Sequence, residues 1–276
     1  MRNRAESRPR YLIAAVSARA LACSAARAGI AVHVIDLFAD ADTREVSASA
    51  TALPQGLDSP GLTEAADAVD PEHESQVIYG GGFEGAPDRL RALCEHRALC
   101  GNAPEVLDLL CDPERVAQKL TELGVPRPAF SSGTPAAMRG WLIKRAGSCG
   151  GVHVREATTG PARDGEYYQR KLEGHTLSVT LLADGESAQA IGYAEQWHAL
   201  QDGTRLRARA PSPFLFGGAV SLPADALPAT LRAEIEHAAS KLSTALGLVG
   251  LNALDVIVNG TTWALVDINA RPGFCF

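Results

Sequence analysis

The chain has 276 residues, of which 46% are hydrophobic and 21% charged, so it can bury a substantial core as one large domain or two to three small ones. Its formal net charge of −6 argues against nucleic acid or an anionic membrane as the main partner, because these partners require clustered positive charge. The apolar stretch from residue 11 to residue 35 is interrupted by charged and glycine residues, so it belongs to the fold interior and not to a membrane span or signal.

The six cysteines form no CxxC pair and have no histidine partner at metal-ligand spacing. We therefore expect reduced thiols in the core of a cytoplasmic protein, with neither zinc nor disulfide bonds. The cysteines are Cys23, Cys94, Cys100, Cys111, Cys149 and Cys275.

The first structural unit predicted from the sequence is a β-α-β unit. An apolar run beginning at Tyr11 is followed by an Ala-rich helix that ends before Gly29 and by a second apolar run that ends at Asp36. The turn after the first strand, residues 17–19, lacks the GxGxxG pattern. This absence disfavours a dinucleotide site and, with it, an NAD(H)-dependent oxidoreductase.

Two segments follow this unit. Residues 47–61 are rich in Pro, Ala and Ser and predict a surface loop. The sequence QVIYGGGFE, residues 76–84, predicts a third strand that runs into three glycines and Glu84. Such glycines permit close approach of the backbone to another group, but a flexible connection explains them equally well. If the first explanation holds, Glu84 and Gly80–Gly82 can form one wall of a substrate site.

Residues 103–128 predict two short helices followed by a Gly-Val-Pro exit, which marks a boundary. From about residue 127 the pattern changes to short strands with turn signals. A further helix has apolar residues at helical spacing and stops at Gly247. The predicted strands are WLIKR (141–145), GVHVRE (151–156), EYYQRKL (166–172), TLSVTLLADG (176–185) and AQAIGYAEQW (188–197).

A lysine followed by a glycine-rich loop stands between two of these strands. Lys144 ends an apolar strand, and the loop after it contains Gly147, Ser148, Gly150 and Gly151. Backbone N–H groups of such a loop can bind phosphate while the lysine supplies a positive charge. Neither the Walker A pattern nor a following helix is present. A glycine-rich hairpin turn beside an edge lysine is the structural alternative.

The next strand ends in a polar turn. Its residues 169–172 can line an adenine with their backbone, while Glu173 can reach a ribose hydroxyl. An ordinary strand and turn would look the same. The residues concerned are Gln169, Arg170, Lys171, Leu172 and Glu173.

The final hairpin, ALDVIVNGTTWALVDIN (253–269), has an aspartate at a core-like position in each strand, Asp255 and Asp267. Buried carboxylates cost several kcal/mol unless they are paired or coordinate a metal. Two carboxylates and the amide oxygen of Asn269 suit a hard cation such as Mg²⁺ carrying nucleotide phosphates. The structural alternative is a salt bridge from Asp267 to Arg271 or to an arginine of residues 205–209.

Strand periodicity places Asp267, Asn269 and Arg271 on one face. A two-residue Asn-Gly turn would set the two aspartates on opposite faces. A three-residue loop that includes Thr261, with a bulge, would pair Val258 with Thr262 and bring both aspartates to one face. A shared metal site requires the second geometry.

Taken in order, the lysine and glycine loop, the hinge with Glu-Gly, and the terminal D…DxNxRPG pattern resemble the ATP-grasp superfamily of ATP-dependent carboxylate–amine and carboxylate–thiol ligases. The resemblance implies an α/β (α+β) ATP-grasp fold. It implies a Rossmann-like pre-ATP-grasp domain at residues 1–100 and a helical linker with a small central β-rich lid subdomain at 101–168. The remaining residues, 169–276, would form a C-terminal antiparallel-sheet subdomain with the metal site.

The resemblance also assigns roles. Lys144 would contact the ATP phosphates under a flap formed by residues 147–151, with residues 169–172 as the adenine hinge. Asp255, Asp267 and Asn269 would hold Mg²⁺, or Mn²⁺ in its place, and Arg271 would stabilise the transferring phosphoryl group. Arg115 or Lys119 would supply a second nucleotide-binding cation. Asp267 departs from the family, which usually has glutamate there, and the small Ala253 stands where some ligases have arginine.

The implied reaction is ATP-dependent activation of a carboxylate to an acyl phosphate, followed by amide formation with an amine and release of ADP and phosphate. The expected partners are therefore small-molecule carboxylates and amines, without nucleic acid or membrane, and a homodimer is compatible with them. A non-catalytic ATP-binding regulatory protein is the alternative. The nearest resemblance is to small ligases of one-carbon cofactor biosynthesis, such as tyramine–glutamate ligase. Arg205, Arg207 and Arg209, which alternate along a predicted strand, can grip a substrate anion or form a solvated edge.

Overall fold

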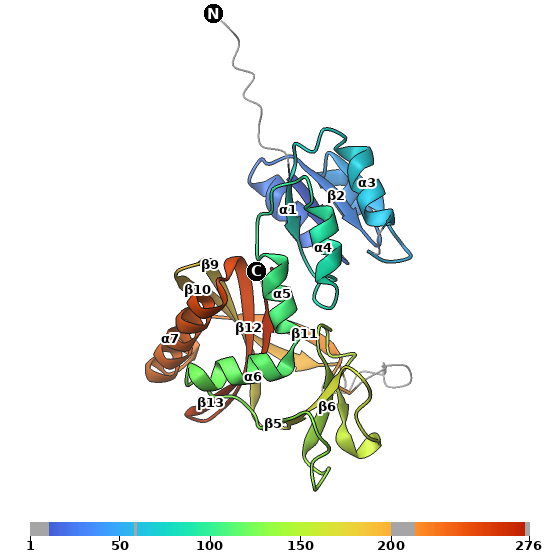
Figure 1. The fold of residues 1–276 in the computed structure, drawn as a ribbon. Helices are drawn as coiled ribbons and strands as arrows, with labels where there is room; N and C mark the ends of the chain where they lie inside the picture. Colours follow the sequence, from blue (N-terminus) through green and yellow to red (C-terminus); the bar gives the residue numbers. More distant parts are fainter. Residues whose placement is uncertain (1–10, 58–59, 200–212, 274–276) are drawn as a thin grey trace, which may run out of the picture. The chain divides into compact units, whose positions relative to one another are not determined.

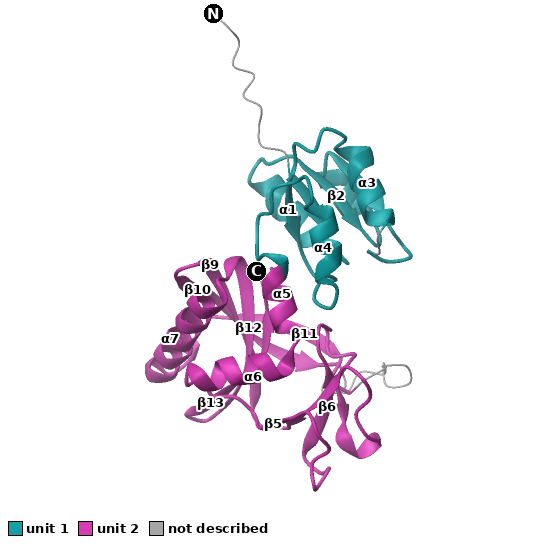
Figure 2. Cartoon of the chain, viewed as in Figure 1, with its two compact units in different colours: residues 1–104 teal, residues 105–276 magenta. Residues whose placement is uncertain are grey.

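The computed structural model describes residues 11–57, 60–199 and 213–273 and divides the chain into two compact units, residues 1–104 and 105–276 (Figures 1 and 2). The structure is a mixed α/β fold with one parallel and two antiparallel sheets, which confirms the predicted fold class. Among the described residues, no helix is both long enough and apolar enough to cross a membrane.

The first unit contains a parallel four-stranded sheet with the strand order β3-β2-β1-β4. Leu12, Ile13 and Ala14 of β1 are all buried, as expected for a parallel strand whose two faces are both covered. The predicted β-α-β unit is present as β1, α1 and β2. The elements are β1 (Tyr11–Ala14), α1 (Arg19–Arg27), β2 (Val32–Asp36), α2 (Ala41–Val46), β3 (Ser49–Ala52), α3 (Gly61–Val69), β4 (Gln76–Tyr79) and α4 (Pro87–Leu93).

The expected surface loop at residues 47–61 is wrong in its first part, because Ser49–Ala52 form the edge strand β3 and pair with β2. The four residues of this strand, SATA, are small and only half-buried, so they give no apolar alternation. The glycines after β4 do allow close approach, but to the unit's own backbone and side chains. A Cβ on Gly80 would lie 2.8 Å from the Cβ of Ala15.

The second unit contains two antiparallel sheets, with the strand orders β5-β8-β6-β7 and β11-β10-β9-β12-β13. Its helices are α5 (Pro104–Leu110), α6 (Pro113–Glu122) and α7 (Ala229–Leu246). Its strands are β5 (Phe130–Ser131), β6 (Trp141–Arg145), β7 (Arg155–Glu156), β8 (Glu166–Arg170), β9 (His175–Asp184), β10 (Ala188–His198), β11 (Phe216–Leu222), β12 (Val249–Asn259) and β13 (Thr262–Asn269).

One face of the five-stranded sheet is apolar and is covered by helices. Leu177, Val179 and Leu181 of β9 share a buried cluster with Ile235 of α7 and Leu120 of α6. Because side chains alternate along a strand, Thr176, Ser178 and Thr180 lie on the opposite face. The polar row predicted for the last hairpin belongs to this opposite face.

The two short helices predicted at residues 103–128 are α5 and α6. The predicted stop of the last helix is also confirmed, since Gly247 is its C-cap with a left-handed φ of 64°. The predicted strand GVHVRE is wrong over residues 151–154, and only Arg155–Glu156 form β7. Gly150 and Gly151 have φ values of 69° and 76°, which a strand does not contain.

The five described cysteines are free, and Cys275 lies outside the described residues. Four of the five are half-buried. Cys100 is exposed, and because none of the five described cysteines is fully buried, the expectation of core thiols is wrong for them. Its thiol donates to the side-chain oxygen of Gln76 at 2.8 Å.

Candidate active site

A β-bulge in the last hairpin brings its two aspartates together. The turn contains only Gly260 and Thr261, so the expected three-residue loop with Val258 paired to Thr262 is wrong: Val258 pairs with Trp263. The register then shifts between Val256 and Asp255, and Val266 is the extra residue on β13. Beyond this bulge Asp255 stands directly opposite Asp267. The sequence predicted a bulge at the turn of this hairpin, whereas the structure has the bulge at Val266, next to Asp267.

Asp255 also lies opposite Ser178 on the other neighbouring strand, so a polar row crosses β9, β12 and β13. Its carboxylate accepts hydrogen bonds from the amide of Asn269 at 3.1 Å and from the amide of Gln196 at 3.3 Å. A hydrogen bond from Ser178 lowers the pKa of Asp255. The site is therefore organised by neutral donors from three strands.

Burial and, after it, the nearby charge of Asp267 raise the pKa of Asp255 to about 6, against the lowering effect of its hydrogen bonds. The ionised form of Asp255 is disfavoured because it is poorly solvated and lies near a second carboxylate. A bound cation between them would remove this penalty.

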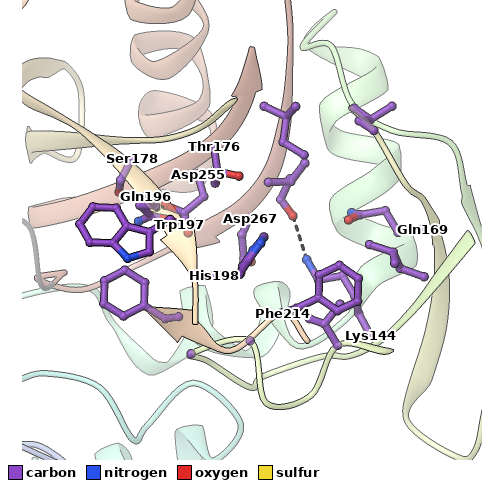
Figure 3. Close-up of a pocket in the computed structure, with 18 of the residues that line it drawn as sticks. Lys144, Gln169, Thr176, Ser178, Gln196, Trp197, His198, Phe214, Asp255 and Asp267 are labelled. Carbon is purple, nitrogen blue, oxygen red and sulfur yellow. Dashed lines mark hydrogen bonds between the residues drawn. The ribbon is translucent and has the colours of Figure 1, made fainter. Parts of the chain in front are cut away.

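Lys144 of β6 reaches the same place from the other sheet of this unit. Its ammonium group donates to the backbone oxygen of Val266 at 3.0 Å, a hydrogen bond drawn dashed in Figure 3. Its side chain is almost fully buried, which by itself would lower its pKa. The charges of Asp267, Tyr167 and Asp255 outweigh that effect and raise the pKa, so the lysine is a fixed positive charge.

Arg271, the arginine of the predicted motif, is 6% exposed. Its guanidinium donates to the side-chain oxygen of Asn269 at 3.2 Å and to the backbone oxygen of Pro272 at 3.1 Å. Asn269 therefore joins Arg271 to Asp255 in a continuous hydrogen-bonded chain. This chain fixes the orientation of the Asn269 amide, with its oxygen toward the arginine and its nitrogen toward the aspartate.

These groups line a cavity of about 800 Å³ in the second unit (Figure 3). The cavity brings together most of the residues singled out in the sequence. They are Lys144, Gly150, Gly151, Gln169, Arg170, Lys171, Leu172, Glu173, Asp255, Asp267, Asn269 and Arg271. Gly147 and Ser148 line a smaller cavity of about 90 Å³, which shares Lys144 and Gln169 with the large one.

The glycine-rich flap is fastened to β11. The N–H of Phe216 donates to the backbone oxygen of Gly150 at 3.0 Å. A Cβ on Gly151 would lie 1.9 Å from the backbone oxygen of Phe214, so only glycine fits at this contact. The flap is therefore held as a wall of the cavity.

The predicted hinge has two of its backbone donors already in use: Arg170 N–H donates to Ala129 at 2.8 Å and Lys171 N–H to Gly140 at 3.0 Å. Leu172 provides the next N–H along the hinge. The Lys171 ammonium pairs with Glu156 at 2.8 Å and lies 5.6 Å from the ring centre of Phe214. These contacts connect the hinge to the flap side of the cavity.

Two cationic candidates are not part of this site. Arg115 and Lys119 line neither cavity, and Lys119 pairs with Glu122, one turn along α6, at 3.3 Å. The proposed second nucleotide-binding cation is therefore not placed at the cavity by either residue. Arg205, Arg207 and Arg209 lie outside the described residues.

Two histidines that sequence reasoning missed line the cavity, His153 from the flap loop and His198 from β10 (Figure 3 labels the second). Burial lowers the pKa of both rings, with nearby lysines adding to the effect. His198 packs edge-on against Phe214 with ring centres 5.6 Å apart. No pattern of spacing marks either histidine in the sequence, because their significance depends on tertiary proximity to Lys144 and Lys171.

The side chains present suit a magnesium ion. Two half-buried carboxylates, on residues paired across neighbouring strands, offer hard oxygen ligands; the oxygen of the Asn269 amide accepts from Arg271 in this structure and would have to turn toward the carboxylates to join them. Among the described residues, no group of three or more His, Cys, Asp or Glu side chains is placed to hold a metal ion. Burial and the neighbouring charge of Asp267, which raise the pKa of Asp255, are the conditions under which a carboxylate gains from a bound cation.

Comparison with known proteins identifies the family. The model of the ATP-grasp domain matches residues 112–273, which is more than half of the chain. The chain belongs to the ATP-grasp domain family. The matched residues include the whole lining of the large cavity and the terminal aspartate, asparagine and arginine pattern, so the resemblance noted in the sequence is confirmed.

A curated relative is the carbamoyl phosphate synthase large chain of Rubrobacter xylanophilus, 24% identical over 194 residues. These residues are 62% of this chain and only 17% of that protein, so the chain spans a small part of the relative's length.

Solved structures share the ATP-grasp fold at low sequence identity. An ADP complex of N5-carboxyaminoimidazole ribonucleotide synthetase superposes with a TM-score of 0.73 at 16% identity, covering 97% of this chain and 71% of that one. The biotin carboxylase domain of Hydrogenobacter thermophilus 2-oxoglutarate carboxylase, solved with MgADP, ADP and bicarbonate, gives a TM-score of 0.68 at 16% identity. It covers 96% of this chain and 64% of that domain.

Proposed function

We propose that this ATP-grasp chain is an ATP-dependent carboxylate–amine ligase that forms an amide through an acyl phosphate and releases ADP and phosphate. The observation that carries the proposal is the meeting of Asp255 and Asp267 on adjacent strands, with Lys144 arriving from a second sheet. This arrangement brings two acidic groups and one basic group to the wall of one cavity, which suits a metal-bound polyphosphate.

The roles of the chain's own residues follow from their geometry. Lys144 would donate to a phosphate oxygen, and the N–H groups of Gly150 and Gly151 would close over the phosphates as a preorganised anion site. The backbone at Leu172 would bind the adenine edge, with Glu173 beside the ribose. Each of these groups lines the large cavity.

Asp255, Asp267 and Asn269 would hold Mg²⁺, with Mn²⁺ as a substitute. The ion would neutralise phosphate charge during phosphoryl transfer. Arg271, fixed by Asn269, would stabilise negative charge on the transferring phosphoryl group. The proposed chemistry requires no side-chain nucleophile, so Cys149 is expected to be dispensable.

A direct assay tests the proposal. The full chain is incubated with ATP, Mg²⁺ and pooled carboxylates and amines, and ADP release is followed together with the amide product. We expect ADP release that requires both a carboxylate and an amine, and full activity in Cys149→Ser. Nucleotide-stabilised melting without turnover in any mixture would instead favour the non-catalytic ATP-binding alternative.

A further inference from the structure

His153 stands in the flap loop at the junction of the two cavities. It lines both of them, together with Lys144. Its neighbours in the chain differ in exposure: Val152 is 52% exposed and Val154 is buried, and the N–H of Val154 donates to the backbone oxygen of Gly151 at 3.2 Å. The imidazole is thus carried by the part of the flap that is fastened to β11.

The Nδ1 atom of His153 is shut off from solvent and has no hydrogen-bond partner among the residues that the structure describes. A buried polar atom without a partner costs about 1–3 kcal/mol, so native proteins rarely retain one without a use. At Nδ1 an imidazole can present either an N–H or a lone pair, according to the group that it meets. A ligand that supplies an acceptor would satisfy this atom.

The residues around the ring indicate which ligand fits: His153 lines the smaller cavity together with Lys144 and Asp267. Burial and then the charge of Lys144 lower the pKa of His153, while the charge of Asp267 acts in the opposite direction. The ring therefore shares the wall of one cavity with both the buried lysine and the proposed metal-binding edge. In the proposed function, that is the place where the outer phosphates of ATP lie.

We propose that His153 is a phosphate-binding residue of the flap, whose Nδ1–H donates to the β- or γ-phosphate of the bound nucleotide. The inference rests on the proposed function, because it takes the cavity to be a nucleotide site. The sequence assigned phosphate binding only to the glycine-rich segment of the flap, and His153 adds a side-chain contact to it. A phosphate oxygen at Nδ1 selects the ring form that carries a proton there, and so removes the unsatisfied atom.

Binding of nucleotides that differ only in their phosphates tests this inference. Titrations of the full chain with Mg²⁺ and AMP-PNP, ADP or AMP are compared for the wild type, His153→Ala, His153→Asn and His153→Gln. We expect His153→Ala to bind AMP-PNP and ADP about tenfold more weakly, which is the loss of one hydrogen bond to a charged group. AMP, which lacks the outer phosphates, should change less than about twofold.

The conservative variants separate hydrogen bonding from packing. The side-chain amide of asparagine places an N–H near the position of Nδ1, whereas that of glutamine places it near Nε2, so His153→Asn should recover most of the affinity and His153→Gln should not. Val152→Ala, at the exposed neighbour, is the matched flap control and should bind like the wild type. Melting curves without nucleotide verify that each variant is folded.

The outcomes distinguish the two proposals. Unchanged AMP-PNP binding in His153→Ala, or an equal loss for AMP, overturns the role of His153 and leaves the proposed function standing. Equal recovery by asparagine and glutamine also overturns it, because packing alone would then explain the residue. Failure of the wild type to bind AMP-PNP at all overturns the proposed function and this inference together.

Discussion

Replacing Asp255 with asparagine should stabilise the metal-free protein while removing its metal-dependent nucleotide binding. The pKa of Asp255 rises from 3.8 to about 6 in the folded chain, mainly through burial and then through Asp267. This rise corresponds to about 3 kcal/mol of unfavourable free energy when the carboxyl is ionised. Because the amide loses hydrogen bonds that the carboxylate accepts from Gln196 and Asn269, we expect a net gain of about 1–3 kcal/mol.

The direction of the pKa shift determines how the contribution of Asp255 to folding stability changes with pH. Since the folded chain binds the proton more tightly than the unfolded chain, stability falls as the pH rises from about 4 to about 6, and the whole penalty is present above that range. In EDTA at pH 7.5, Asp255→Asn should therefore melt at a temperature roughly 2–10 °C higher than the wild type. The difference should shrink at pH 5.

Differential scanning calorimetry in EDTA, with Asp164→Asn as the control at an exposed aspartate, measures the effect. A second scan with Mg²⁺ and ADP should stabilise the wild type and leave Asp255→Asn almost unchanged, because ligand binding to the folded state raises the melting temperature. A lower melting temperature for Asp255→Asn in EDTA at pH 7.5 would refute the reasoning, since the ionised carboxylate would then stabilise the fold.

Four further substitutions test other parts of the structure, and Gly150→Ala is the control for Gly151→Ala. Lys144→Met should weaken AMP-PNP binding more than tenfold in a titration, because a buried positive charge is lost; equal affinity would remove the lysine from the site. Gly151→Ala should weaken AMP-PNP binding about tenfold, because its Cβ would clash with the backbone oxygen of Phe214. Gly150→Ala has open space around its Cβ and should lose only about 1 kcal/mol of stability in urea unfolding. Equal behaviour of the two variants would contradict the anchored flap. Arg97→Ala should cost about 3–5 kcal/mol in urea unfolding, because the 3.1 Å partner of Arg97, Asp70, would remain buried and charged; a loss below 1 kcal/mol would show that water replaces the arginine.

Local patterns were enough to predict the elements with strong periodicity. The β-α-β unit, the helices α5 and α6 and the strand β6 are present, because each has apolar residues at the spacing of its own type and clear end signals. The edge strand β3 and the short helix α2 were missed. Both are short elements with half-buried or polar residues, whose formation depends on pairing and packing with distant segments.

The candidate site was predictable where residue types alone restrict the chemistry. Asp255, Asp267 and Asn269 stood out because acids in an apolar hairpin need partners. His153 and His198 gave no such signal, since an isolated histidine in a strand or loop has many structural uses. Their relation to the cavity follows only from the meeting of two sheets, which no local pattern contains.

The bulge at Val266 explains why the hairpin could not be derived from strict alternation. A regular ladder closed by the Gly260-Thr261 turn would place Asp267 on the helix-covered face of the sheet, away from Asp255. The extra residue turns Asp267 back to the polar face, and its own backbone oxygen, displaced from the regular ladder, accepts the hydrogen bond of Lys144. One irregular residue therefore aligns both the proposed metal ligands and the lysine. A local departure from pattern at this position is what a site built on two opposed carboxylates requires.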